Sequence, residues 1–179
     1  LVGLTWSCES SNSVAAIAAD YAEATRAFPH SRFAILTNTP AESALLSRVG
    51  VSNMLANELI FVDERLSTVV AEPAPTLARF DAIYVARLDP LKRHELAAAI
   101  PSLVLTHGPP QPGQAERVKD LLPKARFANF EAGGAYAYLR DAEVVNLMNR
   151  AAVGLCLSTA EGSMRVSMEY RLCGTPVVS

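Results

Sequence analysis

The stretch AIYVARLDPLKR, residues 82–93, determines the fold class of this chain. Its first five residues are mostly apolar and have the composition of a buried strand, and a turn that contains a proline follows. A helical pattern is expected to begin directly afterwards, at His94. Neighbouring parallel strands are joined by a crossover connection, which is usually a helix. Because both faces of a parallel sheet are buried, its strands are apolar throughout. The stretch therefore indicates one strand-and-helix unit of a parallel sheet, with Arg87 and Lys92 near the point where the strand ends.

The same unit recurs in both directions along the chain. Its clearest local signal is Thr39-Pro40-Ala41-Glu42, in which threonine caps a helix, proline fits the first turn and glutamate completes a capping box. Strands are expected at 1–6, 33–36, 54–56, 82–86, 103–106, 126–130, 153–157 and 176–179, and helices at 14–28, 39–49, 94–100, 114–122, 141–150 and 163–173. This alternation predicts an α/β fold, with Rossmann-like parallel sheets covered by helices on both faces.

A polar stretch with two prolines, residues 67–77, interrupts the alternation, and we interpret it as a linker. It divides the chain into two Rossmann-like lobes, the last part of one at 1–66 and a more complete one at 78–179. The chain begins at Leu1 with a strand-like run and ends at Ser179 after another. We therefore expect it to be a span of a longer protein, with the second lobe truncated at its carboxyl end.

The composition excludes several classes of protein. Half of the 179 residues are hydrophobic and 19% are charged, which excludes a disordered chain. A net charge of −2 argues against a nucleic-acid binder, which needs a basic face to neutralise phosphates. No apolar run approaches the length that spans a bilayer. The three cysteines lack the spacing of a zinc site or a disulfide framework, so we expect a reducing, cytoplasmic location.

Arg87 and Lys92 form the first candidate site. In doubly wound sheets, ligands bind beyond the carboxyl ends of the strands. Two cations at a strand-to-helix junction suit a diphosphate, and the dipole of the following helix adds to the attraction. The alternative is that both are solvated basic residues near a helix start.

The second candidate site is the segment from Ser158 to Tyr170. A buried-type strand runs into a loop that contains Glu161 and Gly162, and a helix is expected from Ser163. The free N–H groups of its first turn can bind an anion, and carboxylates at Glu161 and Glu169 suit a hydroxyl-rich ligand such as a ribose or a sugar ring. Alternatively, Glu161 balances the helix dipole and Glu169 is a surface residue.

Taken together, these segments resemble a known family. Ala86-Arg87 with Lys92, then Asn149 to Leu155, Glu161-Gly162 with Glu169, and finally Cys173-Gly174-Thr175-Pro176-Val177-Val178 resemble the C-terminal lobe of GT-B glycosyltransferases, in particular the retaining family 4. The resemblance extends from Ala82 to Val178, and residues 1–66 would correspond to the last part of the N-terminal, acceptor-side lobe.

The resemblance implies a role for each matching residue. Arg87 and Lys92 match the pair that holds the donor diphosphate and stabilises the leaving nucleotide. Glu161 matches an acid near the hydroxyls of the transferred sugar, and Glu169 matches the acid that binds the donor ribose. Gly162, Ser163, Met164 and Arg165 match the loop whose backbone faces the phosphates and the sugar.

The activity implied by the resemblance is transfer of a hexosyl unit, with retention, from a nucleoside diphosphate sugar to a carbohydrate or lipid-linked acceptor, as in polysaccharide biosynthesis. No metal or other cofactor is expected, because fixed cations stabilise the leaving group. Peripheral membrane contact is an expectation for the full-length protein only. A nucleotide-sugar epimerase on the same fold and a non-catalytic nucleotide-sugar-binding fragment are the alternatives.

The chain departs from the family pattern at two positions near the expected site. Ser163-Met164 stands where Phe-Gly is common, so the side chain of Met164 is expected to alter the sugar pocket. Ala86 replaces the glycine that often precedes the strand-end arginine.

Overall fold

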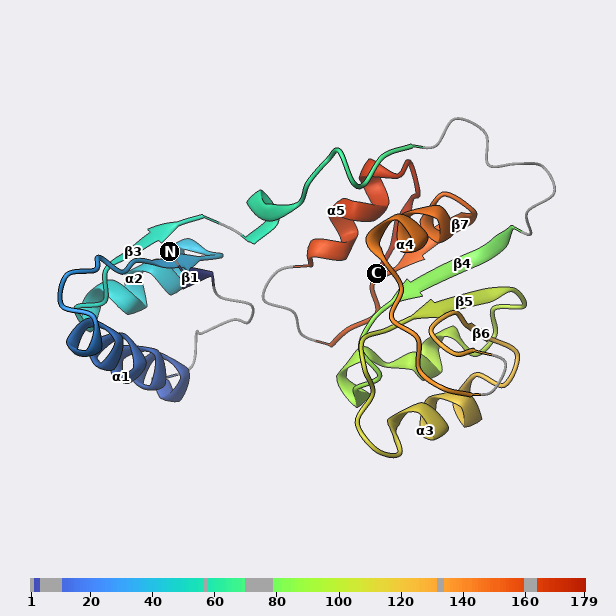
Figure 1. The fold of residues 1–179 in the computed structure, drawn as a ribbon, viewed down its shortest axis with the longest axis horizontal. Coiled ribbons are helices and arrows are strands. Elements are labelled where there is room, and N and C mark those ends of the chain that lie inside the picture. The colour runs from blue at the N-terminus through green and yellow to red at the C-terminus, as the bar shows by residue number, and fades with distance from the viewer. Residues whose placement is uncertain (1, 4–10, 57, 70–78, 132–133, 160–163) are drawn as a thin grey trace. The chain divides into compact units, whose positions relative to one another are not determined.

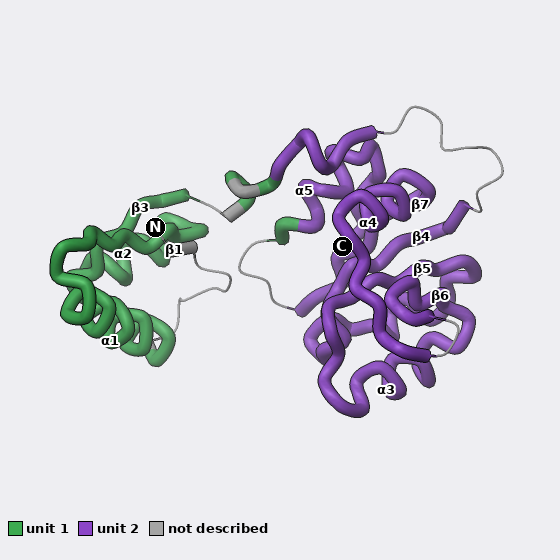
Figure 2. The backbone as a smooth tube through the Cα atoms, in the orientation of Figure 1, with its two compact units in different colours: residues 1–62, 161–165 green, residues 63–160, 166–179 purple. Residues whose placement is uncertain are grey.

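The computed structural model describes residues 2–3, 11–56, 58–69, 79–131, 134–159 and 164–179 (Figure 1). The chain forms two compact units, one of residues 1–62 and 161–165 and one of residues 63–160 and 166–179 (Figure 2). Of the expected linker, residues 70–77 lie outside the described residues, so the predicted lobe boundaries stay a prediction.

Unit 1 contains a three-stranded parallel sheet in the order β1-β2-β3. Its elements are β1 (Val2–Gly3), α1 (Ser11–Ala27), β2 (Ile35–Thr37), α2 (Pro40–Arg48), β3 (Asn53–Leu55) and η1 (Glu58–Phe61). Val14 of α1, Ile35 of β2 and Leu46 of α2 pack together with Val51 in a small core. The apolar faces of the two helices thus pack against the sheet, as their periodicity predicted.

The predicted capping box at the start of α2 is confirmed. The side chain of Thr39 accepts a hydrogen bond from the N–H of Glu42 at 3.1 Å. Oε2 of Glu42 accepts in return from the N–H groups of Asn38 at 2.7 Å and Thr39 at 3.1 Å. Glu42 is completely buried, because its carboxylate satisfies backbone donors that would otherwise lack partners.

We expect Glu42→Ala to lower the free energy of unfolding by about 2 kcal/mol, because two N–H groups lose a charged acceptor. Glu42→Gln keeps one acceptor oxygen, so we expect it to cost less than half as much. The measurement is urea unfolding followed by circular dichroism, with Glu23→Ala on the exposed face of α1 as the control. Equal stability of the Glu42→Ala and Glu23→Ala variants would contradict the assigned role.

Unit 2 contains a five-stranded parallel sheet in the order β6-β5-β4-β7-β8. Its elements are β4 (Phe80–Val85), η2 (Pro90–Lys92), η3 (His94–Ala97), β5 (Leu103–Thr106), α3 (Gln114–Leu121), β6 (Arg126–Phe127), α4 (Asp141–Met148), β7 (Ala151–Leu155), α5 (Arg165–Leu172) and β8 (Val177–Val178). Helices α4 and α5 lie on one side of the sheet and α3 lies on the other (Figure 1). The predicted α/β class, a parallel sheet with helices around it, is confirmed.

The strand order reverses between β4 and β7. From β4 the chain proceeds through β5 to β6 in one direction, and from β7 to β8 in the other. Ile83, at the centre of β4, pairs with Val104 of β5 and with Gly154 of β7, and is completely buried. In doubly wound sheets, such a reversal opens a crevice at the carboxyl ends of the two central strands. Arg87 follows β4 at this edge.

Several predicted elements differ in extent. The helix expected at 94–100 is wrong: only a short 3₁₀ turn, η3, lies there, and it is separated from η2 by Arg93, whose left-handed backbone interrupts the helical path. The strand expected at 126–130 is shorter, because the side chain of Asn129 binds the N–H of His107 instead of continuing the ladder. The strand expected at 153–157 begins earlier, at Ala151.

Candidate functional site

The first cation of the site is exposed and paired. Arg87 lies two residues beyond the end of β4, and its Nε is 2.9 Å from Oδ2 of Asp89. The two side chains are 58% and 22% exposed, so the pair is a surface one, worth no more than about 1 kcal/mol. An anionic ligand of higher charge can therefore displace the Asp89 carboxylate from Arg87 at little cost in free energy.

The second cation is attached to the sheet through its backbone. Lys92 is half-buried at the end of η2, and its carbonyl accepts a hydrogen bond from the hydroxyl of Tyr84. Tyr84 belongs to β4 and is 2% exposed. The buried phenol thus fixes the turn that carries Lys92 relative to the strand that leads to Arg87.

The turn after β4 is joined to the segment that follows β7. The N–H of Thr159 donates to the carbonyl of Leu91 at 3.0 Å. The Nε of Arg93 donates to the carbonyl of Leu157 at 2.5 Å. The structure thus brings residues 91–93 and 157–159 together at the carboxyl edge of the sheet.

Tyr170 connects α5 to β4 beneath this edge. Its hydroxyl accepts from the N–H of Val85 at 2.9 Å and donates to the carbonyl of Ile83 at 3.3 Å. The side chain is completely buried, and burial raises the pKa of the phenol, so it stays neutral. Tyr170 was not among the site residues predicted from the sequence. The signal was Gly154 inside a buried strand, since a glycine there indicates a close approach by another group.

The second predicted segment is described only in part. Glu161, Gly162 and Ser163 lie outside the described residues, so their roles stay predictions. Met164 is half-buried directly before α5, and Arg165 is the exposed first residue of that helix. Glu169 is half-buried on α5, next to Tyr170 and therefore on a helix that is anchored to β4. The roles predicted for these three residues also remain untested.

Two histidines are buried near the same edge. His107 follows β5 and packs against the rings of Phe130 and Tyr136, and burial lowers its pKa. His94, in η3, packs against Tyr84, and burial lowers its pKa to about 4. Both are therefore neutral at pH 7. Within the described residues, no group of three or more histidine, cysteine, aspartate or glutamate side chains could hold a metal ion.

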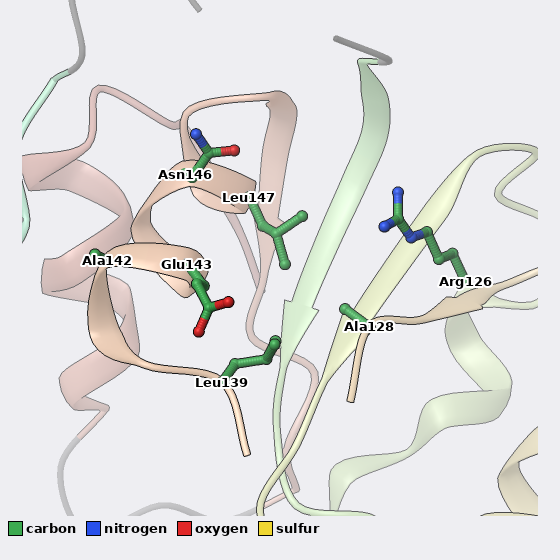
Figure 3. A pocket seen from close by; sticks show the side chains of 7 residues that line it. All are labelled: Arg126, Ala128, Leu139, Ala142, Glu143, Asn146 and Leu147. Atoms are coloured by element: carbon green, nitrogen blue, oxygen red, sulfur yellow. The ribbon is translucent and has the colours of Figure 1, made fainter. Parts of the chain in front are cut away.

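A pocket of about 340 Å³ lies between β6 and α4 (Figure 3). Arg126 borders it from the β6 side and Glu143 and Asn146 from the α4 side. Its lining residues are Arg126, Ala128, Leu139, Ala142, Glu143, Asn146 and Leu147. None of these residues was predicted as a site residue, and neither Arg87 nor Lys92 lines this pocket.

In the described part of the chain, none of the helices combines the length and the apolar character required to span a membrane.

Comparison with known proteins places the fold. No family model and no curated protein sequence matches the chain. Among solved structures, sucrose-phosphate synthase from Thermosynechococcus elongatus matches with a TM-score of 0.59 at 22% identity, over 94% of this chain and 43% of that chain. Anabaena HepE in complex with UDP-glucose matches with a TM-score of 0.59 at 17% identity, over 97% of this chain and 51% of that chain.

A third structure is AviGT4, a glycosyltransferase involved in avilamycin A biosynthesis, with a TM-score of 0.51 at 17% identity over 80% of this chain and 42% of that chain. The chain therefore spans about half the length of the structures that it matches. At these identities the likeness concerns the fold. Over the part that matches these structures, this chain has the fold of the GT-B glycosyltransferases.

Proposed function

We propose that the chain is the nucleotide-sugar-binding part of a glycosyltransferase. The observation that carries the proposal is the position of Arg87 and Lys92 beside the strand-order reversal, on a fold shared with a protein solved with UDP-glucose. Cations at the carboxyl edge of a doubly wound sheet suit the diphosphate of such a donor.

The chemistry that these residues support is departure of the nucleoside diphosphate. When the bond between the sugar and the diphosphate breaks, negative charge develops on the leaving oxygen. The Tyr84 hydroxyl fixes the backbone of the turn that carries Lys92, and Asp89 pairs with Arg87, so both cations are placed at this edge before that charge appears. Preorganised cations stabilise such a charge without a reorganisation cost. We therefore propose that the reaction needs no metal ion.

The finer parts of the proposal follow the family resemblance. The transferred group is a hexosyl unit, the acceptor is a carbohydrate or lipid-linked molecule of polysaccharide biosynthesis, and the anomeric configuration is retained. Glu161 would contact the sugar hydroxyls, Glu169 the ribose, and the backbone of residues 162–165 the phosphates. The reaction would take place in the cytoplasm. Nuclear magnetic resonance of the product formed by the complete enzyme would test retention through the anomeric coupling constant.

Donor binding tests the proposal directly. We expect the chain to bind UDP-glucose or another nucleoside diphosphate sugar in a calorimetric titration. Arg87→Gln and Lys92→Met should each weaken this affinity about tenfold or more, the value of one lost charge-assisted hydrogen bond. Arg79→Gln is the matched control, because Arg79 is exposed directly before β4, at the opposite edge of the sheet.

Two outcomes would contradict the proposed function. The first is that the chain binds none of the common nucleoside diphosphates or their sugars. The second is that the Arg87 and Lys92 variants bind as tightly as the Arg79 control.

A further inference from the structure

Arg93 has an unusual backbone. Its φ is 47° and its ψ is 49°, and among the described residues it is the one non-glycine residue with a positive φ. A left-handed conformation costs an ordinary L-residue about 1–2 kcal/mol, and glycine adopts it without this penalty. An arginine at such a position is therefore held there by its surroundings, and its side chain is the part that a glycine would lack.

The side chain of Arg93 reaches across the strand-order reversal. Its backbone lies in the turn after β4, whereas its Nε donates to the carbonyl of Leu157, two residues beyond the end of β7. The guanidinium thus lies at the carboxyl edge where the two central strands end. This is the edge at which Arg87 and Lys92 are placed.

Within the part of the chain that the structure describes, no acidic side chain pairs with Arg93. The side chain is half-buried, and its acceptor, the Leu157 carbonyl, is neutral. Among the described residues Asp89 pairs with Arg87, and no ion pair is found for Arg93. Removing a cation from water is costly unless an anion compensates it. Since Nε holds Leu157, the two terminal nitrogens of the guanidinium can bind such an anion.

We propose that Arg93 is a third cation of the nucleotide-sugar site, which binds a diphosphate oxygen from the β7 side of the crevice. The inference rests on the proposed function and adds to the site a phosphate-binding residue that was not predicted from the sequence. In this arrangement the Nε–H stays on Leu157 and orients the guanidinium, while its terminal nitrogens contact the phosphate.

Three variants separate the charge of Arg93 from its contact with Leu157. Arg93→Gln removes the charge, and we expect it to weaken UDP binding about tenfold while uridine binding is unchanged. Arg93→Lys keeps the charge and loses the Nε–H that orients the guanidinium, so we expect a UDP affinity between those of the wild type and of Arg93→Gln. Arg93→Gly should bind UDP as weakly as Arg93→Gln, although relief of the backbone strain leaves it at least as stable to urea.

The outcomes distinguish this inference from the function on which it rests. If wild-type chain binds UDP, Arg87→Gln weakens that binding and Arg93→Gln does not, the role of Arg93 is overturned and the proposed function stands. If Arg93→Lys is as weak as Arg93→Gln, Arg93 serves to hold the loop and the third-cation role is overturned. If the wild-type chain binds no nucleoside diphosphate, both fail together.

Discussion

Gly154→Ala is expected to destabilise unit 2 by about 3 kcal/mol, at the upper end of the range for overpacked cores. A Cβ at this position would lie 2.3 Å from Cδ2 and 2.4 Å from Cγ of Tyr170, far inside van der Waals contact. The ring cannot move away easily, because its hydroxyl is bound to Val85 and Ile83 of β4. Either β7 or α5 must therefore shift.

Gly108→Ala is the matched control for this prediction. A Cβ at Gly108 meets no atom within 4 Å, and Gly108 lies outside the strands. The free energies of unfolding of both variants and of the wild type would be measured in urea by circular dichroism. If Gly154→Ala is as stable as Gly108→Ala, the close packing of Tyr170 against β7 is refuted.

Acidification is expected to destabilise the chain through His94. Burial, with the positive charge of Arg117, lowers the pKa of His94 from 6.5 to about 4, although Glu95 and Asp89 act in the opposite sense. Between these two values the unfolded chain binds a proton that the folded chain does not, so stability falls as the pH falls. Over this range the loss from His94 amounts to about 3 kcal/mol.

The measurement is the free energy of unfolding in urea at several pH values between 7.5 and 4.5. His94→Phe removes the titrating group and two ring nitrogens that lack a partner within the described residues, so its stability should depend less on pH. His30→Gln, on an exposed residue, should keep the wild-type slope. A slope that His94→Phe leaves unchanged would assign the acid sensitivity to other groups, among which His107 is the next candidate.

Local sequence signals predicted the elements that depend on neighbouring residues. The capping box at Thr39 and Glu42 is formed within one helical turn, so its residues specify it directly. The apolar runs of β4 and β5 likewise predicted buried strands. Placement of Arg87 beyond β4 followed from the strand boundary alone.

Long-range contacts were beyond the reach of the same reasoning. The apolar residues from Leu96 to Ile100 fit a helical period, but the backbone of Arg93 is left-handed and its side chain is bound to Leu157, and only the short 3₁₀ turn η3 forms there. Tyr170 could be assigned to a helix, yet its partners lie in β4, 85 and 87 residues away. No periodicity encodes a partner at that distance, because tertiary packing selects it.

The strand order of unit 2 also sets the order in which its parts can form. Strands β4, β5 and β6 are neighbours in the chain as well as in the sheet, whereas the bond from Arg93 to Leu157 closes a loop of 64 residues and that from Val85 to Tyr170 one of 85. Closing long loops costs chain entropy before any contact repays it, so such pairings form slowly. The contacts of Arg93 with Leu157 and of Val85 with Tyr170 should therefore form late in refolding. A ligand bound at this edge of the sheet would stabilise the fully folded chain over its partly folded forms.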